Sequence, residues 1–137
     1  MVSFRGDTTL VVEANALLDV CRFLRHDPAM DYSFLVDLAA VDYHPREPRF
    51  GVSYLLYAFK HNVRLRLRVL LPSQMARLLS VSGVWPSAEW MEREAFDLMG
   101  IEFADHPDLR RILMPADWEG HPLRKDYPLG YEEVQFS

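Results

Sequence analysis

The chain has 137 residues, of which 50% are hydrophobic and 26% charged, and its formal net charge is -5. This length is enough for one domain with a hydrophobic core and too short for two, and the composition is that of an ordinary globular domain. The acidic balance disfavours a nucleic-acid-binding protein, because such proteins neutralise phosphate groups with Lys and Arg.

The single cysteine, Cys21, restricts the chemistry that this chain can hold. One cysteine cannot form an internal disulfide, a cysteine-ligated iron–sulfur cluster or a four-cysteine zinc site. We therefore expect a reducing compartment. No apolar run approaches the roughly 18 to 20 residues that cross a bilayer, and the first residues lack the apolar core of a signal peptide. Any association with a membrane is then expected to be made through other chains.

The first predicted elements are a strand and an amphipathic helix. The β-branched residues of "TTLVVEA" at 8–14 are typical of a strand. Apolar residues then recur at three- and four-residue spacing, which predicts a helix that ends before residue 27. They are Ala14, Leu17, Leu18, Cys21 and Leu24. Since Cys21 lies on this stripe, we interpret it as a buried small apolar residue rather than a reactive thiol.

The middle of the chain predicts a β-hairpin. The segment "YSFLVDLAAVDY" at 32–43 suggests a short helix at its start and a strand at its end, and the prolines of "HPREPR" at 44–49 indicate a loop. After it, "FGVSYLLYAF" and "VRLRLRVLL" flank the tripeptide "KHN". Two apolar strands around three polar residues are typical of a hairpin with a three-residue loop.

The expected register of this hairpin gives it one core face and one arginine-bearing face. The core-facing pairs join Phe59, Tyr57 and Leu55 to Val63, Leu65 and Leu67. The outward-facing pairs join Ala58, Leu56 and Tyr54 to Arg64, Arg66 and Arg68. Two interpretations follow: a solvated face on which arginine stems cover Leu and Tyr, or a face that is covered by an acidic partner.

A second helix is predicted within "AEWMEREAFDLMGIEF" at 88–103. Ser87 is expected to cap its start, and Gly100 is expected to end it in the left-handed conformation. Arg93 and Asp97, four residues apart, are expected to form an ion pair. Because the helix has no clean polar face, we expect neighbours on more than one side of it.

Around this helix lie groups that an acid–base pair or a zinc site would use. They are Glu92, Glu94, Asp97, His106 and His121. The spacing disfavours such a site, because Glu92 and Glu94 point roughly 200 degrees apart on a helix and neither belongs to a Glu-x-x-His pair. A free-standing metal-dependent enzyme remains an alternative function.

The carboxyl-terminal part contains a near-repeat. "DHPDLRRI" at 105–112 returns as "GHPLRKDY" at 120–127, each with a His-Pro pair, a leucine and two basic residues. Proline restricts the residue before it to extended backbone, so each histidine is expected on an extended segment. This predicts a binding strap that is anchored twice, since an enzyme pocket needs its histidine on a rigid element.

The stretch "EREAFDLMGIEFADHPDLRRIL" followed by "DWEGHPLRKDYPL" resembles the signature of the thirty-kilodalton subunit, or C subunit, of the proton-pumping NADH-quinone oxidoreductase, respiratory complex I. The upstream order of helix, "FLVDLAAVDY", hairpin and "WPSAEW" is also similar to that family, so the resemblance covers nearly the whole chain. One departure is Ala95, where members of the family more often carry a hydroxyl or a larger residue.

The resemblance implies a non-catalytic scaffold or assembly subunit of the peripheral arm of a membrane-bound complex that couples electron transfer to proton translocation. Its implied partners are the forty-nine-kilodalton-like quinone-site subunit and neighbouring cluster-bearing subunits. Iron–sulfur clusters, flavin, NAD and quinone would be bound by those partners and none by this chain. The implied location is the cytoplasmic side of the inner membrane. The alternative is the equivalent subunit of a ferredoxin-, deazaflavin- or formate-linked complex.

The resemblance also implies residues and a domain plan. The candidate assembly and packing positions are Glu92, Arg93, Glu94, Asp97, His106, Arg110, Arg111, His121, Arg124, Lys125 and Asp126. None is expected to be catalytic or to bind a metal or cofactor. We expect a two-layer α+β domain over residues 1–104, with helices packed on a mixed β-sheet, followed by an extended C-terminal arm over 105–137 that docks on partner subunits.

Overall fold

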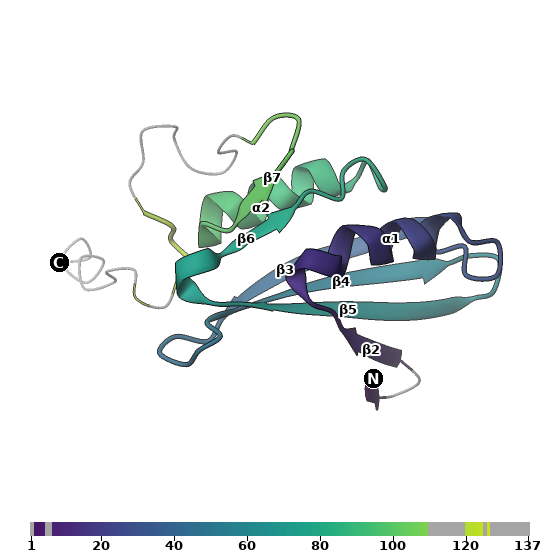
Figure 1. The fold of residues 1–137 in the computed structure, drawn as a ribbon, viewed down its shortest axis with the longest axis horizontal. Helices are drawn as coiled ribbons and strands as arrows, with labels where there is room; N and C mark the ends of the chain where they lie inside the picture. Colours follow the sequence, from purple (N-terminus) through teal and green to yellow (C-terminus); the bar gives the residue numbers. More distant parts are fainter. Residues whose placement is uncertain (1, 5–6, 110–119, 125, 127–137) are drawn as a thin grey trace, which may run out of the picture.

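The computed structural model describes residues 2–4, 7–109, 120–124 and 126 of the chain (Figure 1). A five-stranded mixed sheet with the strand order β1-β2-β5-β4-β3 forms its lower layer. The strands β2 and β5 run parallel, and the other neighbouring strands run antiparallel. The bounds are β1 Val2–Phe4, β2 Asp7–Val11, β3 Phe34–Asp42, β4 Phe50–Ala58 and β5 Val63–Leu71.

The second layer consists of two helices that lie on the same side of this sheet (Figure 1). Helix α1 spans Leu17–His26 after the 3-10 turn η1, Ala14–Ala16, and helix α2 spans Ala88–Met99. Between them the turn η2, Ser73–Met75, leads to a small parallel sheet of β6, Arg77–Leu79, and β7, Glu102–Ala104. The predicted α+β fold with helices on a mixed sheet is confirmed. In the part of the chain that the structure describes, no helix is long and apolar enough to cross a bilayer.

The hydrophobic core lies between the helices and the sheet. Helix α1 contributes Leu17, Cys21 and Leu24 to it. Trp85 is also buried in the core, where its indole Nε1 donates a hydrogen bond of 2.9 Å to the carbonyl of Tyr32. Cys21 is fully buried, as its place on the apolar stripe predicts. Burial raises the pKa of the Cys21 thiol to about 12, which keeps it neutral.

The hairpin register differs from the expected one by one residue on β4. Ala58 pairs with Val63, so the loop holds the four residues 59–62 instead of three. Asn62 takes a positive φ of 53° within this loop. The alternation of Arg and Leu predicts correctly which residues of β5 face the core. Strand β4 carries apolar residues on both faces, so the length of the hairpin loop decides which of its faces points to the core. The core-facing pairs are therefore Leu56 with Leu65 and Tyr54 with Leu67.

The segment 32–43 contains no helix, in contrast to the expectation. It forms the edge strand β3, which pairs with β4 from Phe34 to Asp42. The register shifts between Leu35 and Asp37, which places the buried residues Leu35 and Leu38 three apart. A bulge of this kind imitates the spacing of a helix, because one extra residue interrupts the alternation of a strand.

Of the two predicted ends of helix α2, one is confirmed. Gly100 ends the helix with a φ of 76°, in the left-handed region, as expected. The expected side-chain cap at Ser87 is wrong, because its hydroxyl lies 3.5 Å from the carbonyl oxygen of Leu35 and makes no capping bond.

The observed register can be checked by comparing Leu56→Ala with its neighbour Leu55→Ala. Leu56 is fully buried and Leu55 lies on the opposite face of β4, half-buried. We expect Leu56→Ala to lower the free energy of unfolding by about 2 to 5 kcal/mol and Leu55→Ala by clearly less. Urea denaturation measures both. A larger loss for Leu55→Ala would support the register expected from the sequence.

Candidate functional site

The motif residues gather around helix α2, and Glu92 is one of those with no exposed surface. Its Oε1 accepts a hydrogen bond of 2.6 Å from the hydroxyl of Ser80, and its Oε2 accepts one of 2.8 Å from the backbone N–H of Val81. Burial raises the pKa of Glu92, and these two hydrogen bonds oppose the rise. The carboxylate thus ties α2 to the segment that follows β6.

His106 holds the other side of the same region. Its Nε2 lies 2.8 Å from the carbonyl oxygen of Glu89, and its Nδ1 accepts a bond of 2.9 Å from the backbone N–H of Asp108. Because a carbonyl only accepts and a backbone N–H only donates, these partners assign the neutral imidazole with its proton on Nε2. The side chain is fully buried, and Nε2 lies 3.9 Å from Oε1 of Glu92.

The C-terminal end of α2 is closed by a segment more than twenty residues further along the chain. A helix leaves its last four carbonyl groups without partners inside the helix. All four accept hydrogen bonds here: Phe96 from the N–H of Gly100 at 2.8 Å, Asp97 from Nδ1 of His121 at 2.8 Å, Leu98 from the N–H of Leu123 at 3.0 Å, and Met99 from Nε of Arg124 at 2.6 Å. Three of the four partners belong to residues 120–124, which we call the capping segment.

Gly100 makes this closure sterically feasible. Its φ of 76° is one that residues with a Cβ rarely adopt. A Cβ at this position would also lie 2.5 Å from Nη2 of Arg124 and 2.6 Å from Cδ2 of His121. The glycine is therefore required both by the backbone conformation and by the close approach of the capping segment.

A second tie holds the same part of the chain to the connection between β3 and β4. Arg49 donates two hydrogen bonds of 2.8 Å to the buried carboxylate of Asp42 and a third, of 2.6 Å, to Oδ1 of Asp126. The hydrogen bond from Arg49 lowers the pKa of Asp126. The guanidinium groups of Arg49 and Arg124 lie over the ring of Phe50, at 5.0 and 5.3 Å from its centre.

The remaining signature residues point elsewhere. The guanidinium of Arg93 lies over the ring of Trp90 at 5.5 Å, and Asp97 is fully buried; their ion pair stays a prediction. Glu94 is exposed and lines a groove of about 240 Å³ between β3 and α2. Arg110, Arg111 and Lys125 lie outside the described residues.

The two histidines of the motif contact opposite ends of helix α2. His106 and His121 contact the carbonyls of Glu89 and Asp97, which are eight residues apart and so about 12 Å along the helix. Within the ranges that the structure describes, no three His, Cys, Asp or Glu side chains could hold a metal ion together.

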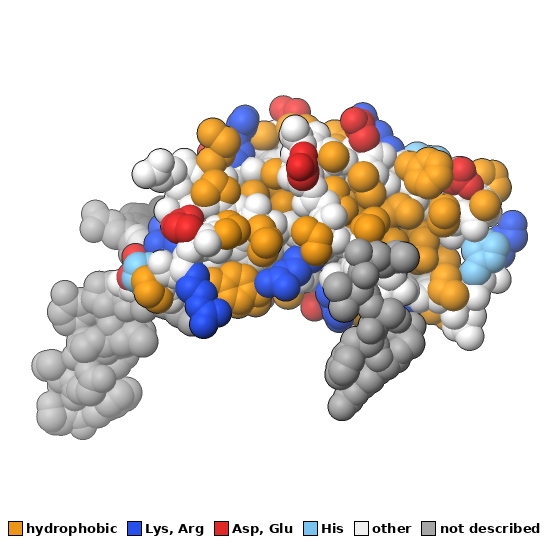
Figure 2. All heavy atoms as spheres, turned by 60° about the horizontal axis from the view of Figure 1, so that its bottom comes forward, with side chains coloured by type: hydrophobic (Ala, Val, Ile, Leu, Met, Phe, Trp, Pro, Cys, Tyr) orange, Lys and Arg blue, Asp and Glu red, His pale blue; other side chains and the backbone are white. Residues whose placement is uncertain are grey.

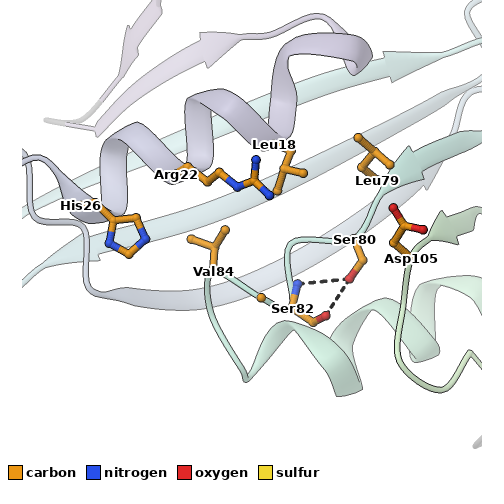
Figure 3. Close-up of a pocket in the computed structure, with 9 residues that line it drawn as sticks. Leu18, Arg22, His26, Leu79, Ser80, Ser82, Val84 and Asp105 are labelled. Carbon is orange, nitrogen blue, oxygen red and sulfur yellow. Dashed lines mark hydrogen bonds between the residues drawn. The ribbon is translucent and has the colours of Figure 1, made fainter.

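Sequence reasoning missed the partners of these residues, namely Ser80, Asp42 and Arg49. Ser80 also bonds Ser82 at 2.8 Å between hydroxyl oxygens, and both line a hollow of about 300 Å³ between α1 and the segment after β6 (Figure 3). In this view Arg22 of α1 and Asp105 approach the hollow from different elements. No local pattern identifies Ser80 as the partner of Glu92 or Arg49 as the partner of Asp126, because these pairs are 12 and 77 residues apart in the sequence.

Comparison with known proteins shows what the chain is similar to. Residues 10–133 match the family model described as respiratory-chain NADH dehydrogenase, 30 Kd subunit. A relative from Roseiflexus sp. (strain RS-1), named as the C subunit of NADH-quinone oxidoreductase, is 52% identical over 134 residues, which cover 98% of this chain and 77% of the relative. A protein of the same name from Geobacter sulfurreducens is 51% identical over 127 residues, which cover 92% of this chain and 77% of that protein.

Two solved structures share the fold. A trypsin-resistant fragment of Nqo5 is 34% identical, with a TM-score of 0.67 over 76% of this chain and 83% of that one. A chain of the membrane-bound sulfane sulfur reductase, an archaeal respiratory membrane complex, has a TM-score of 0.83 over 99% of this chain and 81% of that one. Its identity is 23%, so it supports the fold alone.

Replacement of Gly100 tests the closure of α2. Gly100→Ala should lower the free energy of unfolding by more than about 1 kcal/mol, because the φ is unfavourable for alanine and the Cβ displaces the capping segment. Gly83→Ala is the matched control, since a Cβ there has no neighbour within 4 Å. Thermal and urea unfolding measure both variants, and equal stability of the two would contradict the role of Gly100.

Glu92 predicts a specific pH dependence of stability. Its pKa is raised in the folded state, so the folded chain keeps this proton to higher pH than the unfolded chain. Stability from this group therefore falls as the pH rises above about 4.3, the usual value for glutamic acid. Glu92→Gln removes that ionisation. We therefore expect the free energy of unfolding of this variant, relative to that of the natural chain, to rise as the pH increases from about 4.3 to neutrality.

The control for this experiment is Glu94→Gln, which removes a carboxylate from the exposed side of the same helix. Urea denaturation at a series of pH values gives the stability of both variants. The same pH profile for the two would show that the burial of Glu92 does not control its ionisation.

Proposed function

The chain belongs to the family of the 30 kDa subunit of respiratory-chain NADH dehydrogenase, and from this premise we propose that it is a scaffold subunit in the hydrophilic arm of a membrane-bound NADH-quinone oxidoreductase. In this proposal the complex couples electron transfer to proton translocation. This chain positions its neighbours and supplies no catalytic residue.

The observation that carries the proposal is the use to which the signature residues are put. Both oxygens of Glu92 accept hydrogen bonds from the chain itself, and both ring nitrogens of His106 are engaged in the same way. His121 and Arg124 close a helix end. Residues held by such contacts stabilise a shape, whereas a catalytic acid or base needs access to a substrate.

The proposed cofactors belong to the partners. Iron–sulfur clusters, flavin, NAD and quinone would be bound by the forty-nine-kilodalton-like quinone-site subunit and by neighbouring cluster-bearing subunits. The presence of one cysteine in this chain supports that division, since a cluster needs several cysteine ligands. We propose a location on the cytoplasmic side of the inner membrane, with attachment through those subunits.

The contacts of residues 120–124 and 126 bear on our proposal for the C-terminal arm. Residues 120–124 cap α2, and Asp126 bonds Arg49, so these residues are engaged within the chain. We therefore assign the docking role of the arm to residues 127–137. A deletion of residues 116–137 would also remove the capping segment. Its effect on assembly could then come either from lost stability of the chain or from lost docking.

A chain that ends at Asp126 tests this role directly. We expect it to retain its free energy of unfolding within about 0.5 kcal/mol, because the capping contacts remain. We also expect it to be lost from the complex. The measurement is purification of the chain with an amino-terminal affinity tag from detergent-solubilised membranes of its own host, followed by mass spectrometry of the proteins recovered with it.

The full-length chain is the control and separates two failures. Its recovery without respiratory subunits, in the soluble fraction alone, would contradict the proposed function. Its recovery with those subunits, together with equal recovery of the shortened chain, would contradict only the docking role of residues 127–137.

A further inference from the structure

The face of the large sheet that points away from both helices carries exposed apolar side chains. No described helix covers this face (Figure 1), and Figure 2 shows hydrophobic and basic side chains gathered on the underside of the molecule. A sheet face in contact with water normally carries polar residues. Four large apolar residues of this face are 38% to 57% exposed: Val11, Phe34, Val41 and Leu70.

The basic residues of this face form a straight row on its central strand. Strand β5 is the middle strand of the five, and its residues Arg64, Arg66 and Arg68 alternate with the buried Leu65 and Leu67. Alternate residues of a strand stand about 7 Å apart. The observed register sets them beside Tyr57, Leu55 and Ser53 of β4, respectively.

One end of the row meets an exposed aromatic cluster. The ring of Phe59, 64% exposed, lies 4.7 Å from that of Tyr57 and 5.7 Å from that of Phe34. Tyr57 is the cross-strand neighbour of Arg64. Aromatic residues and arginine are the types that contribute most to binding energy at protein interfaces.

The other end of the row is held by contacts of Tyr43 with Gly51 and Arg68. Tyr43 lies across Gly51, where an added Cβ would be 2.9 Å from its ring. The guanidinium of Arg68 stacks over that ring at 5.4 Å and donates a hydrogen bond to its hydroxyl. Beside this pair is a hollow of about 230 Å³ lined by Tyr43, Arg46, Glu47, Pro48, Arg68 and Leu70. Ordering Arg68 in advance lowers the entropic cost of binding a carboxylate there.

We propose that this face, from the aromatic cluster to Tyr43, is the docking surface for a partner protein that presents carboxylates between apolar side chains. The inference rests on the proposed function, because the partner is then another subunit of the same complex. Arginine suits such a partner, since its planar guanidinium binds a carboxylate through two parallel hydrogen bonds. The interspersed apolar residues require a partner surface that excludes water as well.

Two other occupants fit the face less well. A second copy packed through the same face about a two-fold axis would set one arginine row against the other, which is repulsive. An anionic lipid surface would be attracted to the arginines, but Asp37 lies in the same cross-strand row as Leu55 and Arg66. A partner protein can pair this carboxylate with a basic residue, whereas lipid phosphates repel it.

The first test is the double charge reversal Arg64→Glu with Arg66→Glu in the full-length chain, with Arg68 left in place because it orders Tyr43. The matched control is Arg22→Glu with Arg77→Glu, which changes the charge equally at side chains that are 60% and 59% exposed on α1 and β6. We expect the first variant to recover at least about tenfold less of the partner subunits from solubilised membranes, and the control to stay within about twofold.

Thermal unfolding of the isolated variants accompanies this test, because it separates weak docking from weak folding. Equal recovery by the reversed chain and the natural chain would overturn the docking surface and leave the proposed function intact. An equal loss in both double variants would also overturn it, since the effect would then come from net charge. If the natural chain itself recovers no respiratory subunit, the proposed function fails.

A photo-cross-linking amino acid in place of Leu55 identifies the occupant, because Leu55 lies in the middle of the face beside Arg66. We expect a cross-link to another protein of the complex, in a peptide that contains Asp or Glu. A cross-link to a second copy of this chain or to phospholipid would overturn the proposal. The variant Phe59→Ser, which removes an exposed ring and no charge, should also reduce recovery by several-fold if the aromatic cluster contributes.

Discussion

The open carbonyl groups at the C-terminal end of helix α2 are the constraint on which the rest of the structure depends. A helix that ends inside a protein must satisfy these groups. Here the N–H of Gly100 satisfies the first of them, and the capping segment satisfies the other three through His121, Leu123 and Arg124. Gly100 provides the space for it. Arg49 bonds both the buried Asp42 at the end of β3 and Asp126, which follows the capping segment. Since the capping segment holds helix α2, these bonds connect the sheet to the helix layer.

The near-repeat of the sequence acquires a physical meaning from this arrangement. Its first histidine, His106, bonds a carbonyl in the first turn of α2, and its second, His121, bonds one in the last turn. In each case the ring nitrogen donates, because a backbone carbonyl can only accept. In the described residues both histidines therefore contact a helix of the same chain, and the binding of a partner by this part of the chain stays a prediction.

These contacts divide the molecule into two sides with different roles. On the helix side the shape is built from buried polar groups that satisfy one another, with Glu92 and its donors Ser80 and Val81 at the centre. On the opposite side the sheet presents arginines, aromatic rings and apolar residues that the described helices leave uncovered. The scaffold role proposed above would need both properties: a well-packed interior, and a surface whose composition selects a partner.

The sequence by itself determined the fold class, the burial of Cys21, the stop at Gly100 and the faces of β5, because alternation and helical spacing are local properties. It also led to Glu92, His106, His121 and Arg124 through their resemblance to a family signature. Only the tertiary structure decided the register of β4, the bulge of β3 and the contacts of those residues. Strand β4 is apolar on both faces, so the length of its loop sets the register. The partners of the site are backbone carbonyls and distant side chains such as Arg49, and folding alone determines which of them come together.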